Sequence, residues 1–65
     1  MIRQLKSWEK EILRKFETQT YIRTDEEENL IEELKEFNYL TVGIDFDINI
    51  RYAILTDKGL YALRN

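Results

Sequence analysis

The residues best suited to chemistry in this chain are three oxygen-bearing side chains near its middle. Asp45, Asp47 and Asn49 have the D-x-D-x-N spacing that opens a calcium-binding loop. Such a loop also needs glycine at its sixth position and glutamate at its twelfth, but those positions hold Ile50 and Thr56. We therefore interpret the segment as a polar hairpin turn and expect no bound metal.

The composition offers few of the side chains that covalent or acid–base catalysis requires. The chain contains no histidine and no cysteine, and Ser7 is its only serine. A serine becomes a nucleophile when an adjacent base takes its proton, and no such base is visible for Ser7. The many glutamates have the pattern of a hydrated helix surface. We expect a protein that is not an enzyme and that uses no cofactor.

The basic patch that can be read from the sequence lies near the amino terminus. Arg3, Lys6, Lys10 and Arg14 recur at spacings of three, four and four, which places them along one side of a helix. Such a stripe could contact nucleic-acid phosphates or an acidic partner. It could also be an ordinary exposed face, or pair with the acidic helix of a second molecule. The ordinary interpretations are favoured, because runs of charge are weak functional signals.

Some large apolar side chains are candidates for binding a protein, since a short chain cannot bury all of them and aromatic residues often anchor interfaces. The alternative for each is a place in the core. The candidates are Trp8, Phe46 and Ile48, with Tyr21 and Tyr61 beside them. Phe46 and Ile48 are the sharpest case because they flank Asp47 at a predicted hairpin tip.

Length and charge narrow the class of protein. A chain of 65 residues forms at most one domain, 1–65. Its net charge of −3 argues mildly against binding that depends on phosphate neutralisation. We expect a cytoplasmic protein without a membrane anchor. No apolar run approaches the length of a bilayer span, and the first residues lack the apolar core of a secretory signal.

Helical periodicity predicts a first helix over about residues 2–17. Its apolar residues share one side of the helical wheel: Leu5, Trp8, Ile12, Leu13 and Phe16. Glu9 falls in the middle of that apolar face, where a carboxylate needs a cation or a hydrogen-bond donor. We expect Glu9 at an open edge of the core, or beside Arg51 or Arg64.

A turn and one short strand are expected next, over residues 17–24. Thr24 or Asp25 should then cap a second helix that stops near Asn38, because Thr24 and Glu27 have the form of a capping box. The outward face of this helix is acidic and consists of Glu28, Glu32, Glu33 and Glu36, relieved by Lys35. Thr56 should cap a last short helix over residues 57–64.

Between residues 39 and 56 the apolar positions recur at every second residue, which predicts a β-hairpin. An odd loop centred on Asp47 would place all of the apolar pairs on one face: Ile44 with Ile50, Val42 with Tyr52, and Leu40 with Ile54. A two-residue loop would bring polar residues onto that face. We therefore expect the odd loop.

This order of elements resembles the winged-helix superfamily. The segment LIEELKEFNYLTV is similar to a recognition helix that leads into the first wing strand. The segment YAILTDKGLYAL is similar to the second wing strand and the Leu-Thr-x-x-Gly-x-x-x-Leu helix of MarR and PadR regulators. The resemblance implies a small α+β winged-helix-like domain. It does not imply DNA binding, because one fold serves many functions.

Two departures from the family pattern shape the functional expectation. The short helix that normally precedes the recognition helix is shortened or missing. Glu28, Glu32 and Glu36 would also face phosphates in the usual docking mode, which would be repulsive. Asp45 and Asp47 stand at the wing tip, where a DNA-binding wing usually carries Arg or Lys.

We therefore expect a small regulatory module that binds a protein partner or itself as a dimer, of a kind common among phage and plasmid accessory proteins. The main alternative is a DNA-binding transcriptional regulator that contacts phosphates through the first helix. A fainter alternative is that the glutamate face mimics DNA. No small-molecule substrate is expected.

Overall fold

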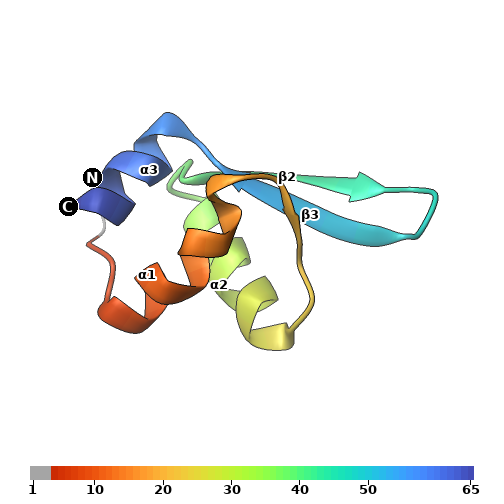
Figure 1. Ribbon diagram of the computed structural model, residues 1–65, viewed down its shortest axis with the longest axis horizontal. Coiled ribbons are helices and arrows are strands. Elements are labelled where there is room, and N and C mark those ends of the chain that lie inside the picture. Colours follow the sequence, from red (N-terminus) through yellow and green to blue (C-terminus); the bar gives the residue numbers. More distant parts are fainter. Residues whose placement is uncertain (1–3) are drawn as a thin grey trace.

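The computed structural model describes residues 4–65, and within them the chain forms a small α+β domain (Figure 1). The elements are α1 (Ser7–Leu13), the 3-10 helix η1 (Arg14–Glu17), β1 (Thr20–Tyr21), α2 (Asp25–Lys35), β2 (Leu40–Asp45), β3 (Ile50–Leu55) and α3 (Asp57–Arg64). The predicted α+β class and the predicted order of elements are confirmed. The described part of the first helix begins at Ser7, because Lys6 is extended. The predicted start near residue 2 lies outside the described residues.

The strands form one antiparallel sheet in the order β1, β3, β2 among the described residues. Figure 1 shows the β2–β3 hairpin projecting beyond the helices, with α1 and α2 lying toward one side of it. The described chain is correspondingly elongated, with principal extents of 35, 20 and 18 Å. The hairpin tip therefore forms one end of the molecule.

The hairpin register differs from the predicted one. Leu40 lies opposite Leu55 and Val42 lies opposite Ala53, across a loop of residues 46–49. The odd loop was wrong because β3 is apolar in both phases. Ala53 and Leu55 are buried against the helices. Ile54, which lies between them in the sequence, is half-buried on the other face of the sheet. Alternation alone could not tell which phase of β3 meets the core.

Threonine hydroxyls cap the amino-terminal starts of α2 and α3, as predicted. The hydroxyl of Thr24 accepts a hydrogen bond from the N–H of Glu27, and that of Thr56 accepts one from the N–H of Gly59, each at 3.1 Å. After α2 the chain turns at Asn38, which has a φ of 63°. Asparagine tolerates this left-handed conformation, so the predicted stop near Asn38 is confirmed.

The core lies between the helices and the base of the hairpin. Its most deeply buried apolar side chains come from the helices, the loop before β2, and β3: Leu13, Phe16, Ile31, Leu34, Tyr39 and Ala53. Gly59 lets α3 approach this base, since a Cβ atom there would lie 2.1 Å from the carbonyl oxygen of Tyr39. None of the helices in residues 4–65 is both long and apolar enough to cross a bilayer.

Candidate functional site

The hairpin tip carries Phe46, the most exposed large apolar side chain of residues 4–65, and two further exposed apolar side chains. Phe46 is 84% exposed, Ile48 is 51% exposed, and Ile44 at the end of β2 is 37% exposed. The predicted position of Phe46 and Ile48 past the edge of the core is therefore confirmed. Their role in binding a partner remains a prediction.

Hydrogen bonds hold the tip in shape. Asp45 accepts one from the Tyr21 hydroxyl at 2.8 Å and another from the backbone N–H of Asp47 at 3.0 Å. The hydrogen bond to Asp45 and the charge of that carboxylate raise the pKa of the Tyr21 phenol. Asn49 completes the turn with a φ of 55°. The Asp45 side chain and the backbone conformation of Asn49 thus shape a turn in which Phe46 is exposed.

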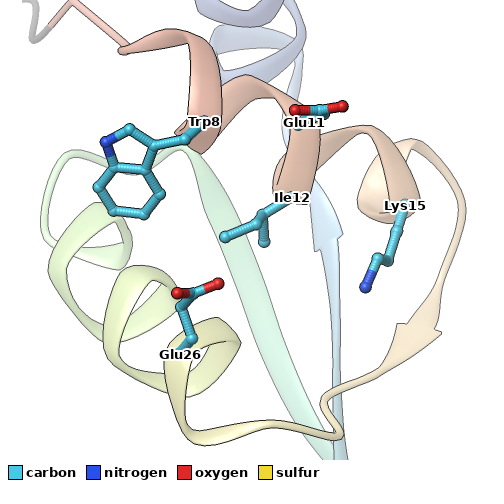
Figure 2. A pocket seen from close by; sticks show the side chains of 5 residues that line it. All are labelled: Trp8, Glu11, Ile12, Lys15 and Glu26. Carbon is cyan, nitrogen blue, oxygen red and sulfur yellow. The ribbon is translucent and has the colours of Figure 1, made fainter.

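Trp8 lies on a second surface, between α1 and the start of α2. Its indole is 49% exposed and lines an open hollow of about 450 Å³. Figure 2 shows the side chains around this hollow: Trp8, Glu11, Ile12, Lys15 and Glu26. Because α1 lies away from the projecting tip (Figure 1), Trp8 does not form one patch with Phe46 and Ile48. The predicted partner-binding residues therefore divide between two surfaces.

The predicted basic stripe is only partly described, because Arg3 lies outside the described residues. Lys6 precedes α1, Lys10 lies within it and Arg14 begins η1. Lys6 and Arg14 are exposed, and Lys10 is half-buried. Among residues 4–65, none of these three side chains takes part in an ion pair. They remain available for an external anion.

Glu9 is buried, but the described structure pairs neither Arg51 nor Arg64 with it. Its side chain is 2% exposed and accepts a hydrogen bond from the backbone N–H of Lys6 at 2.8 Å. Arg51 instead meets Glu28 and Glu32, and Arg64 meets Glu17. Glu9 serves the amino end of its own helix, where backbone N–H groups lack helical partners.

Glu27 is a second buried carboxylate, which sequence reasoning placed only in a capping box. It is 4% exposed, is paired with Lys15 at 2.5 Å, and accepts the N–H of Arg23 at 3.0 Å. Burial alone would raise the pKa of Glu27, but these hydrogen bonds and the charge of Lys15 together lower it. The pair joins the end of α1–η1 to the start of α2.

The acidic face of α2 is partly neutralised by the hairpin. Arg51 of β3 lies 3.1 Å from Glu28 and also bonds Glu32, which Lys35 approaches at 3.1 Å. Hydrogen bonds from Arg51 and Lys35 lower the pKa of Glu32, and the bond to Glu32 raises the pKa of Arg51. The prediction that Lys35 alone relieves this face was wrong, because Arg51 of β3 also pairs with Glu28 and Glu32.

Among residues 4–65, no cluster of three or more histidine, cysteine, aspartate or glutamate side chains could hold a metal ion. Comparison of the chain with protein-family models, curated proteins and solved structures finds no significant match. The exposed tip, the Trp8 hollow and the unpaired cations are therefore the features on which a functional proposal can rest.

Proposed function

We propose that this protein is a small winged-helix-like regulatory module that binds a protein partner or a second copy of itself through the hairpin tip. The observation that carries the proposal is the exposure of Phe46, at 84%, beside the half-exposed Ile48. Full burial of such a side chain contributes about 1.5–3 kcal/mol relative to leaving it in water. A partner that covers both residues would recover much of that free energy. The winged-helix-like assignment is supported by a hairpin that follows a capped helix.

The charges of the hairpin also favour a protein over DNA. Asp45 and Asp47 lie at or beside the tip, where they would repel phosphates. Arg51, the cation within β3, is already bound to Glu28 and Glu32. A wing of this composition offers apolar contact area, and it offers little that would neutralise a nucleic acid.

The proposal is tested by the double substitution Phe46→Ser with Ile48→Ser. We expect it to abolish self-association in analytical ultracentrifugation and capture of a partner from native lysate, while the melting temperature changes little. Tyr61→Ser is the matched control, because Tyr61 is 64% exposed on α3 and lies outside the proposed surface. Unchanged association together with a collapsed melting temperature would show that the pair belongs to the monomer's own core.

A DNA-binding regulator is the second candidate, favoured by the exposed and unpaired Lys6 and Arg14 among the described residues. Under the proposed function, fluorescence anisotropy at physiological salt should show only non-specific affinity for duplex DNA, about 10⁻⁴–10⁻⁶ M. Nanomolar binding that depends on base sequence would promote the second candidate. Lys6→Glu with Arg14→Glu should then weaken binding strongly, whereas Glu36→Gln should not.

A further inference from the structure

The two edges of the sheet differ in how they are protected. β1 is only two residues long, and Arg23 follows two residues after its end. β2 runs for six residues, Leu40–Asp45, and contains neither proline nor a basic side chain. Natural edge strands usually carry such features, or are very short, because an open edge pairs readily with another strand. β2 lacks these protections.

The backbone groups on the open edge of β2 can be identified from the ladder. The N–H of Thr56 donates to the carbonyl of Tyr39 at 2.9 Å, which makes these residues a hydrogen-bonded pair. Antiparallel ladders alternate, so Thr41, Gly43 and Asp45 bond to β3 in turn. The N–H and C=O groups of the intervening residues point away from β3. These outward residues are Leu40, Val42 and Ile44.

We propose that β2 pairs antiparallel with β2 of a second copy, about a two-fold axis at Val42. This inference rests on the proposed function and names the chain itself as the partner. An outward residue can bond only to an outward residue of the other strand. A pair centred on Val42 lets all three outward residues form hydrogen bonds. Val42 then lies opposite the partner's Val42, and Leu40 of each copy lies opposite Ile44 of the other. The two three-stranded sheets then join into one of six strands.

The side chains fit this register. Leu40, Val42 and Ile44 lie on one face of β2, so each meets an apolar residue across the axis and the exposed Ile44 becomes covered. A two-fold interface must be self-complementary in this way. The row of apolar side chains on this face continues toward Phe46, which in the proposed dimer lies beside the start of the partner's β2. One symmetric contact therefore covers both the open edge and the apolar tip.

Charges at the two ends of the strand are also complementary. In this register Asp45 lies opposite the partner's Tyr39, and Asp47 lies just beyond it. The ammonium group of Lys58 lies 5.7 Å from the centre of the Tyr39 ring. Asp45 and Asp47 of each copy thus approach Lys58 of the other. Lys58→Glu should weaken the dimer, and adding Asp47→Lys should restore it.

Cysteine cross-linking tests the register, because the chain has no cysteine of its own. In a hydrogen-bonded antiparallel pair the Cα atoms lie about 5.5 Å apart, a spacing that a disulfide can span. Val42→Cys should therefore give a covalent dimer under mild oxidation. Ser7→Cys, on exposed α1, is the collisional control and should remain monomeric. Equal cross-linking of both variants would overturn the proposed pairing.

Proline substitution tests the edge itself. Ile44→Pro removes an outward N–H and leaves the β3 ladder intact, a place where edge strands accept proline. We expect a monomer in analytical ultracentrifugation with an unchanged circular dichroism spectrum, whereas Ile44→Val should remain dimeric. If Ile44→Pro still dimerises, or if the unaltered protein is monomeric up to millimolar concentration, the β2 pairing is wrong. The proposed function would survive that result if Phe46→Ser with Ile48→Ser still abolished capture of another protein.

Discussion

Phe16 and Phe46 place the same side chain in opposite settings. Phe16, in η1, is fully buried, whereas Phe46, at the hairpin tip, is 84% exposed. The helical body goes further and buries two carboxylates, Glu9 and Glu27, each with hydrogen-bond partners. The helical body, formed by α1, η1 and α2, thus buries Phe16 and pairs its buried carboxylates, whereas the hairpin leaves Phe46 in water. The difference predicts that Phe16 contributes strongly to the stability of the domain and that Phe46 contributes little to it.

The largest expected effect on stability comes from substituting the two phenylalanines and comparing the results. Phe16→Ala should cost about 3–5 kcal/mol, because it leaves a cavity in the core. A loss of that size approaches the whole stability of a small domain. Phe46→Ala should change the stability of the monomer by no more than about 0.5 kcal/mol. Urea denaturation followed by circular dichroism at low protein concentration measures both. A similar cost for the two variants would remove the distinction between body and hairpin.

A smaller effect is expected from the buried carboxylate of the body. Glu27→Gln weakens charged hydrogen bonds from Lys15 and Arg23 and should cost about 1–2 kcal/mol near pH 7. The pKa of Glu27 is lowered on folding from its ordinary value of 4.5. Its contribution is therefore full above about pH 4.5 and is lost as the pH falls through the folded pKa.

Urea titrations at several pH values between neutral and strongly acidic conditions measure this contribution. The unaltered protein should lose more stability on acidification than the Glu27→Gln variant does. Glu26→Gln is a suitable control, because Glu26 precedes Glu27 on α2 and is exposed. Parallel pH profiles for the unaltered and Glu27→Gln proteins would show that the buried pair does not depend on the charge of Glu27.

The smallest effect on stability should come from the ion pair between Arg51 of the hairpin and Glu32 of α2. Arg51 and Glu32 are both partly exposed, and ion pairs in such positions contribute little because solvent and salt screen them. A double-mutant cycle with Arg51→Ala and Glu32→Ala should give a favourable coupling well below the cost of Glu27→Gln. That coupling should shrink further in 1 M salt. A large, salt-insensitive coupling would mean that the hairpin and α2 form one cooperative unit.

The sequence was most informative where local chemistry decides the structure. Thr24 and Thr56 could be recognised as helix caps because each hydroxyl precedes a helical pattern. The exposure of Phe46 and Ile48 could be predicted because both residues flank a turn. The candidate tip therefore followed from local pattern alone.

Features that depend on contacts between distant parts of the chain could not be predicted from local pattern. The phase of β3 depends on which of its two apolar faces meets the helices, and the sequence from Ile50 to Leu55 is compatible with either. The partner of Glu9 was missed because the start of α1 was missed. Lysine is not a preferred N-cap residue, so Lys6 gave no sign that the helix begins after it.

Trp8, described above as one wall of the hollow between α1 and α2, also gives the protein a built-in optical probe. It is the only tryptophan in the chain, so the indole emission reports this one location. A ligand or protein that fills the hollow should shift the emission to shorter wavelength by removing water from the ring. Association through β2 should leave the spectrum unchanged. One fluorescence measurement on the unlabelled protein can therefore tell whether the hollow is occupied.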